Sequence, residues 1–384
     1  MSNRRSRGAH GAVAFCLTLL GAHAAAVHAA PPAGIPLPLN GTSFHTYDMA
    51  FSADGERVCV TGYDIDDMGA SVPVLVLVDR ERGSAAWRKP IALPDVVATA
   101  YPVKCLVGAE RVVLLTNAAT GFTQPGSSAS VYVYAFDLRG NPIASTRLAV
   151  PGQNQYGYTL AETPDRLTVA GYTMDADDKN ERYATFTLHL DQRLQPRGAP
   201  LQRRNGAFAW PFGARLEGDS LYIAGTFFPA TAPAGAAGAI MASRMKANGG
   251  YVWSTPATHV ADVDVRFVVA PDGTTHALSI GPDNLTLTTI GPDGKAHPPS
   301  FQPGTYCSVA SIAPYGDGVA AVVKPCKGKH NRLVTLSLRP DKGTIVKTLP
   351  NEPLYVATKA ALWSALARAP NGKVYLYTGT AGSL

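Results

Sequence analysis

Two acidic stretches have residue types that can bind a divalent cation. Both follow a Gly-Tyr dipeptide, and their carboxylates are Asp64, Asp66 and Asp67 in the first and Asp175, Asp177 and Asp178 in the second. Alternating carboxylates supply the oxygen ligands that calcium prefers, so Asp175 and Asp177 are candidate calcium ligands. Met68 and Lys179 stand where further ligands would be expected, which favours a solvated acidic rim instead. We therefore predict no resident metal.

A basic stretch lies further along the chain, with Lys324, Lys327, Lys329 and His330. If it shares one face of the fold with the acidic stretches, that face is bipolar. Such a face favours a charged protein or ligand that docks in one orientation. Lys327 and Lys329 therefore join the six aspartates as candidate partner-binding residues.

Aromatic residues recur near the starts of apolar segments. In order, these positions carry His45, Tyr47, Tyr101, Tyr156, Tyr158, Phe208, Trp210, Tyr306 and Trp363, with Asp262 and Asp264 among them. Aromatic rings beside carboxylates can stack a sugar or another flat ligand, which makes Tyr158 and Trp210 candidate ligand-binding residues. Asp262 and Asp264 are the candidate acid and base of a hydrolase or lyase. The alternative is that these side chains pack between structural units.

Known catalytic templates are missing from the sequence. It contains no Gly-x-Ser-x-Gly, no His-Glu-x-x-His, no P-loop and no Gly-x-Gly-x-x-Gly between a strand and a helix. The histidines that follow the N-terminal segment are scattered and form no spaced cluster. The sequence therefore favours a binding protein without a cofactor over an enzyme.

The first thirty residues have the features of an export signal. Arg4, Arg5 and Arg7 precede a short apolar core, and small residues surround a cleavage point near Ala29 or Ala30. The apolar core is too short to span a bilayer, and no later run is long enough. We expect a periplasmic or secreted protein without a transmembrane segment. Cleavage would lower the formal charge from +6 to about +3, which argues against a nucleic-acid partner.

Four cysteines remain after the predicted cleavage, and an even number in an exported chain predicts disulfides. Cys307 and Cys326 lie almost symmetrically about a turn at residues 316–318, so a hairpin would bring them together. Cys59 and Cys105 then pair by elimination. None of the four has Cys-x-x-Cys spacing, which argues against a zinc or redox site.

A short sequence motif occurs seven times. It consists of a turn at Gly or Asp and four to six apolar residues, and it often ends with Thr-Gly or Ala-Gly. It begins at Asp54 the first time and at Asn371 the last, and the turns are about 45 to 57 residues apart. Such a period, with short strands in each unit, predicts a β-propeller. Residues 31–384 are predicted to form one all-β, seven-bladed propeller with four antiparallel strands per blade, named a to d from the inside. Residues 35–39 are expected to complete the last blade as its N-terminal strand.

A second turn has its own signature, in which Trp87 and Trp253 each follow a Gly turn closely. This turn resembles the blade motif of the bacterial quinoprotein-like propellers, the superfamily of PQQ-binding-like and YVTN-type repeats. The resemblance implies that these tryptophans pack between adjacent blades. It does not imply the cofactor, because quinone use would call for eight blades, the Trp motif in most of them and vicinal cysteines.

The long b-c loops are the predicted binding face, because variable loops on a rigid scaffold often carry recognition. The leading hypothesis is an exported, monomeric propeller that binds a protein or small ligand through this face, such as a periplasmic inhibitor or immunity-type protein. One alternative is a propeller-fold hydrolase or lyase acting on a carbohydrate or ester. Another is a structural scaffold for envelope assembly.

Overall fold

The computed structural model describes residues 44–65, 71–82, 84–93, 99–119, 128–152, 154–174, 183–204, 208–228, 238–246, 249–257, 265–327, 332–337, 345–348, 364–372 and 374–378. The chain divides into two compact units, Met1–Ala33 and Gly34–Leu384, and every described residue belongs to the second. These residues form strands and turns, as the all-β prediction requires. None of them belongs to a helix that is long and apolar enough to cross a membrane.

Each sheet begins with its innermost strand. The innermost strands are β1 (His45–Phe51), β5 (Thr99–Val107), β9 (Asn154–Thr163), β13 (Phe208–Glu217), β17 (Val265–Val269), β21 (Tyr306–Tyr315) and β25 (Ser364–Arg368). The second strands are β2 (Arg57–Ile65), β6 (Arg111–Ala119), β10 (Arg166–Met174), β14 (Ser220–Phe228), β18 (Thr275–Ile280), β22 (Gly318–Pro325) and β26 (Val374–Thr378).

Two further strands complete six of the sheets on the outside. The third strands are β3 (Ser71–Asp79), β7 (Ala129–Asp137), β11 (Tyr183–Leu190), β15 (Ala239–Lys246), β19 (Asn284–Ile290) and β23 (Arg332–Ser337). The outermost strands are β4 (Ser84–Pro90), β8 (Pro142–Arg147), β12 (Leu201–Arg204), β16 (Tyr251–Ala257), β20 (Ser300–Pro303) and β24 (Ile345–Thr348).

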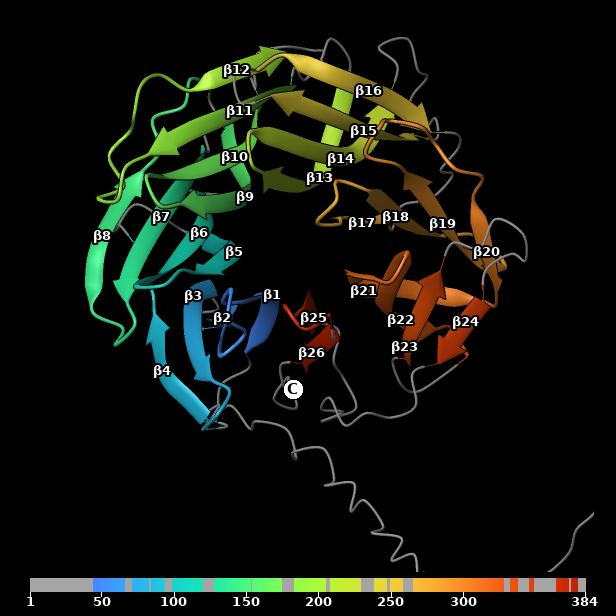
Figure 1. Cartoon of the computed structure of the whole chain (residues 1–384), viewed down its shortest axis with the longest axis horizontal. Coiled ribbons are helices and arrows are strands. Elements are labelled where there is room, and N and C mark those ends of the chain that lie inside the picture. The colour runs from blue at the N-terminus through green and yellow to red at the C-terminus, as the bar shows by residue number, and fades with distance from the viewer. Residues whose placement is uncertain are drawn as a thin grey trace, which may run out of the picture. The chain divides into compact units, whose positions relative to one another are not determined.

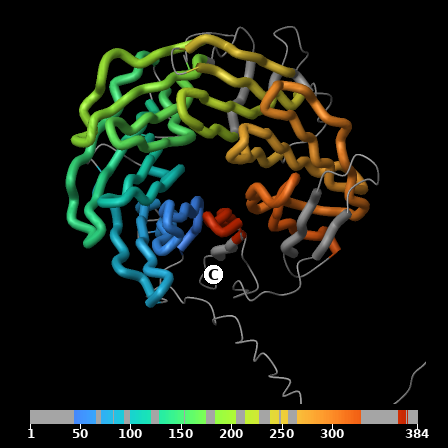
Figure 2. The backbone as a smooth tube through the Cα atoms, viewed as in Figure 1, coloured from blue at the N-terminus to red at the C-terminus, as the bar shows by residue number. Residues whose placement is uncertain are grey.

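The sheets form a propeller ring (Figure 1). Consecutive innermost strands contact one another from β1 to β25 in chain order, and β25 also contacts β1. Figure 2 shows the hairpin of β25 and β26 next to β1, at the point where the ring closes. Ala365 and Ala367 of β25 pack there with Met49 and Val58 of the first sheet. Burial of apolar side chains thus joins the first and last sheets.

The propeller arrangement of antiparallel four-stranded sheets is confirmed, whereas the count of seven complete blades is not. Among the described residues, six sheets have four strands, and β25 and β26 form a two-stranded sheet. Residues 35–39, which were predicted to complete the last blade, lie outside the described part of the chain. In this last sheet, β25 is the innermost strand and pairs with β26 in an antiparallel register.

The core is divided into clusters that lie between neighbouring sheets. Val113 and Val131 of the second sheet, for example, pack with Val169 and Phe186 of the third, and all four side chains are buried. Both faces of each sheet are therefore apolar, which explains why the second strand of each repeat is a nearly continuous apolar run.

A β-bulge recurs in the innermost strands. The pairing register shifts by one residue at Tyr47 in β1, Val103 in β5 and Tyr158 in β9, and similar shifts occur in β13 and β21. The glycine at the end of the repeated sequence motif lies opposite this bulge. A Cβ on Gly62 or on Gly171 would overlap a carbonyl oxygen of the innermost strand, which explains why glycine stands there.

Trp87 and Trp253 pack against the neighbouring sheet, as the resemblance implied. The Trp87 indole donates a hydrogen bond to the Leu138 carbonyl at 3.0 Å, and Trp253 donates to the Pro292 carbonyl at 3.0 Å. The ring of each tryptophan covers a glycine at which a Cβ would approach the ring to about 2.9–3.0 Å, Gly140 for Trp87 and Gly294 for Trp253. These contacts tie the first sheet to the second and the fourth to the fifth.

Both predicted cysteine pairs are confirmed. Cys59 of β2 is bonded to Cys105 of β5 with a Cα–Cα distance of 6.2 Å, and so links the first and second sheets. Cys307 and Cys326 are bonded with a Cα–Cα distance of 4.9 Å, at the end of the hairpin of β21 and β22. Two such pairs fit an oxidising compartment.

Candidate functional site

Most of the predicted loop residues lie outside the described part of the chain. They are Asp66, Asp67, Asp175, Asp177, Asp178, Asp262, Asp264 and Lys329. Trp210 belongs to β13, but its side chain is not among those described. Among the described residues, no three His, Cys, Asp or Glu side chains are grouped to hold a metal ion.

Asp64 and Lys327 are described: Asp64 belongs to β2 of the first sheet, and Lys327 follows β22 of the sixth sheet. Asp64 is held by Arg88 of β4, whose Nη2 lies 2.5 Å from its Oδ2, and the Asp64 side chain is only 15% exposed. Asp64 therefore stabilises its own sheet instead of contributing a solvated charge. Lys327 is exposed, beside the bridge that Cys307 and Cys326 form.

The aromatic residues at the starts of the innermost strands form stacked groups. His45 stacks on Tyr63 with ring centroids 4.8 Å apart, and Tyr63 meets Tyr101 edge to face at 5.7 Å. In the third sheet, Tyr172 lies between Tyr156 at 4.9 Å and Tyr158 at 5.4 Å. Tyr158, a predicted binding residue, is thus part of an ordered aromatic stack.

A cavity occupies the centre of the ring, between the bulges of the innermost strands and the turns that follow these strands. Its volume is about 810 Å³, and all seven innermost strands line it. Its lining begins at the bulged residues Tyr47, Val103 and Tyr158 and continues toward the turns that follow the innermost strands. Bulges frequently occur next to binding sites because they redirect a side chain. The cavity is the candidate functional site.

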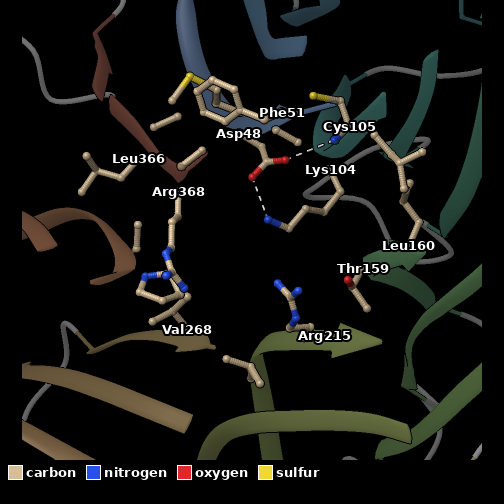
Figure 3. A pocket seen from close by; sticks show the side chains of 18 of the residues that line it. Asp48, Phe51, Lys104, Cys105, Thr159, Leu160, Arg215, Val268, Leu366 and Arg368 are labelled. Carbon is tan, nitrogen blue, oxygen red and sulfur yellow. Dashed lines mark hydrogen bonds and ion pairs between the residues drawn. The ribbon is translucent and has the colours of Figure 1, made fainter. Parts of the chain in front are cut away.

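Asp48 and Lys104 form an ion pair on the cavity wall. Lys104 Nζ lies 2.7 Å from Asp48 Oδ1, and the Cys105 N–H donates to Asp48 Oδ2 at 3.2 Å. The dashed lines in Figure 3 mark both contacts. The carboxylate is 12% exposed and the lysine side chain 41% exposed. Among the described residues this is the one ion pair of Lys104, and an ammonium group has three donors to offer.

Glu162 of β9 also lines the cavity, but its negative charge is neutralised by an arginine that lies outside the cavity. The Arg111 Nε lies 2.7 Å from Glu162 Oε1, and Arg111 also donates to the Gln192 carbonyl at 2.5 Å. The Arg111 side chain is 7% exposed and lies outside the cavity lining. This ion pair fastens the second sheet to the third and leaves little uncompensated negative charge in the cavity.

Two arginines add positive charge from other sheets. Arg215 of β13 forms an ion pair through Nε with the exposed Glu217 at 3.1 Å. Arg368 of β25 is exposed and forms no ion pair with any of the described residues. Figure 3 shows Lys104, Arg215 and Arg368 directed into one central space from three sides. Three cationic side chains therefore converge where two carboxylates already have partners.

Sequence reasoning missed these three cations. They belong to three different repeats and to different positions within the strands, so no spacing connects them. The available signal was weak: each is a cationic residue that follows apolar residues in an innermost strand. Of the predicted residues, the cavity brings together Tyr158 and the neighbouring aromatic Tyr47.

Comparisons with known proteins supply a likeness of fold without a family. No family model matches the sequence, and no curated protein matches it. Similar solved structures include hydrazine synthase from Kuenenia stuttgartiensis, at 11% identity and a TM-score of 0.49, with 88% of this chain and 96% of that chain covered. Apocarotenoid oxygenase from Synechocystis shares 12% identity with a TM-score of 0.42, with 68% of this chain and 65% of that chain covered.

A third similar structure is the acylaminoacyl peptidase from Pyrococcus horikoshii. It shares 12% identity with a TM-score of 0.40, and the alignment covers 79% of this chain and 50% of the peptidase. At these values the activities of the three proteins carry no information about this one.

Proposed function

We propose that this chain is an exported binding propeller that takes a small anionic molecule into its central cavity and performs no chemistry on it. The convergence of Lys104, Arg215 and Arg368 carries the proposal (Figure 3). Carboxylate and phosphate groups are the natural partners of such donors, because charge-assisted hydrogen bonds are about twice as strong as neutral ones.

The hydrogen-bond capacity of the three cations supports this proposal. An ammonium group has three donors and a guanidinium group has five. Among the residues that the structure describes, Lys104 and Arg215 each form one ion pair and Arg368 forms none. A bound anion would therefore gain charge-assisted hydrogen bonds from all three cations.

The chain's export and ring closure belong to the same proposal. Residues 1–30 have the features of a cleaved signal, and two disulfides suit a periplasmic or secreted protein. We propose that β25 and β26 are the inner half of a seventh blade that residues 35–39 complete. Mass spectrometry of the exported protein is expected to show an N-terminus near Ala30.

Two rival functions rest on residues outside the described part of the chain. Asp262 and Asp264 would be the acid and base of a hydrolase or lyase, and the long loops would hold a protein partner. The cavity is the feature whose geometry supports a function directly, so binding of a small molecule is preferred.

Calorimetric titration of the mature protein with inorganic phosphate and with citrate, at low ionic strength, tests the proposal. We expect saturable binding of at least one anion, and a loss of about tenfold or more in affinity for Arg368→Gln and for Arg215→Gln. Arg166→Gln is the matched control, because Arg166 forms a surface pair with the exposed Asp219 at 2.7 Å. If neither anion binds, or if the control weakens binding as much as the cavity variants, the proposal is wrong.

A further inference from the structure

Tyr47 is the most exposed aromatic residue of the cavity wall. It is the bulged residue of β1, and its side chain is 46% exposed although it lies on an innermost strand. Burial nevertheless raises the pKa of its hydroxyl, with Arg266 of β17 opposing that effect. An exposed ring that is still surrounded by protein faces an enclosed space, here the cavity.

Tyr158 is the bulged residue of β9 and lines the same cavity. Its ring stacks on Tyr172 with ring centroids 5.4 Å apart and an interplanar angle of 24°, and Tyr172 stacks on Tyr156 at 4.9 Å. The stack restricts the Tyr158 ring before any ligand arrives. A preorganised ring loses little conformational entropy on binding.

The two tyrosines border the cationic part of the cavity. Tyr47 directly precedes Asp48, which is paired with Lys104 at 2.7 Å, and Tyr158 directly precedes Thr159 of the cavity wall. Successive residues in a strand are about 3.4 Å apart, so Tyr47 and the ion pair of Asp48 with Lys104 are within the length of one small molecule. A single ligand can therefore contact both.

Resting on the proposed function, we propose that the ligand is an aromatic anion. Its anionic group binds Lys104, Arg215 and Arg368, and its ring packs against the aromatic side of the cavity wall, where Tyr47 and Tyr158 lie. Offset stacking on a tyrosine is a specific contact that adds to the burial of apolar area. The cavity thereby distinguishes an aryl anion from inorganic phosphate and from an aliphatic anion of similar size.

The test compares phenyl phosphate, cyclohexyl phosphate and inorganic phosphate by calorimetric titration of the mature protein. We expect the wild type to bind phenyl phosphate about tenfold more tightly than inorganic phosphate, with cyclohexyl phosphate in between. Tyr47→Ala and Tyr158→Ala are expected to remove most of this preference while the affinity for inorganic phosphate stays within about twofold. Tyr251→Ala, which truncates a tyrosine that is 43% exposed on β16, is the matched control and leaves the preference intact.

The outcomes separate this inference from the proposed function. Equal binding of the three phosphates, equal binding of the phenyl and cyclohexyl esters, or a preference that survives in both cavity variants overturns the aromatic inference and leaves anion binding intact. If none of the three compounds binds, the aromatic inference and the phosphate arm of the proposed function fail together, and citrate decides whether anion binding stands. Circular dichroism confirms that each variant is folded, and Tyr47→Phe is expected to keep the preference because it retains the ring.

Discussion

The indole of Trp87 lies flat against Gly140 of the neighbouring sheet. Gly140 has a φ of 83°, and a Cβ built on it would lie 3.0 Å from Trp87 Cγ. The same turn presents the Leu138 carbonyl to the indole N–H at 3.0 Å. Trp87 and Gly140 thus form one contact between the sheets: the indole needs the space that the missing Cβ of the glycine leaves.

Gly140→Ala is expected to lower the free energy of unfolding by about 2–3 kcal/mol, because it combines backbone strain with overpacking against Trp87. Gly218→Ala is the matched control: φ is 54° there, and a Cβ would meet no atom within 4 Å. It is expected to cost about 1 kcal/mol, from backbone strain alone. Urea unfolding of the mature variants gives both values, and equal losses would contradict the role of the Trp87 contact.

The second and third sheets make an equivalent contact in which the small and the large residue have changed places. Ala144 stands on β8 where the tryptophan stands on β4, and Leu194 occupies the glycine position of the next turn with a φ of 61°. Leu194 is fully buried in the cluster against which Ala144 packs. The leucine side chain fills the space that an indole would occupy, and its burial offsets the strain of its backbone.

Leu194→Gly is expected to destabilise the protein by about 2–4 kcal/mol, since the loss of a buried leucine exceeds the strain relieved. Ala144→Trp alone is expected to destabilise through overlap with Leu194. The double variant restores the large-small pair, so we expect it to be more stable than the sum of the single losses by at least 1 kcal/mol. Additive losses in a double-mutant cycle would show that the two positions do not share the space.

Stability is expected to fall in mild acid because of His276. Burial lowers the pKa of this histidine from 6.5 to about 4, and its Nδ1 lies 2.9 Å from the Thr289 hydroxyl. Below pH 6.5 the histidine becomes protonated in the unfolded chain but stays neutral in the folded chain. The free energy of unfolding therefore falls until the pH reaches about 4. The loss attributable to His276 is about 3 kcal/mol over this range.

His276→Gln is expected to remove most of this pH dependence, as measured by urea unfolding at several pH values between 4 and 7. His189→Gln is the matched control, because His189 makes the same contact with Thr168 at 2.9 Å but is only partly buried. Its effect on the pH profile is expected to be smaller. An unchanged profile in His276→Gln would contradict the assignment.

The two disulfides are expected to differ in their resistance to reduction. Cys59 and Cys105 are 0% and 4% exposed, whereas Cys307 and Cys326 are exposed. Limited reductant with alkylation and mass spectrometry should therefore label Cys307 and Cys326 first. Loss of the Cys59 bridge, which spans 46 residues, is expected to cost about 4 kcal/mol by the chain-entropy relation. Labelling of Cys59 before Cys307 would contradict this order.

Much of the fold follows from the sequence because its signals are local. The repeated turn and apolar run specify a hairpin in each unit, and the turn at residues 316–318 brings Cys307 and Cys326 together through simple strand register. The pair of Cys59 and Cys105 followed because one arrangement remained. The tryptophan contacts were implied by a turn signature that is also local. These features depend on neighbours within one or two repeats.

The site depended on the tertiary structure. Lys104, Arg215 and Arg368 lie in separate repeats, and nothing in their spacing indicates that they meet. Closure of the ring through β25 and β1 directs their side chains into one cavity, and the same packing gives Asp48 and Glu162 partners that neutralise them. Which charged side chains remain available for a ligand depends on which of them pair with residues far away in the sequence. Residue spacing does not contain that information.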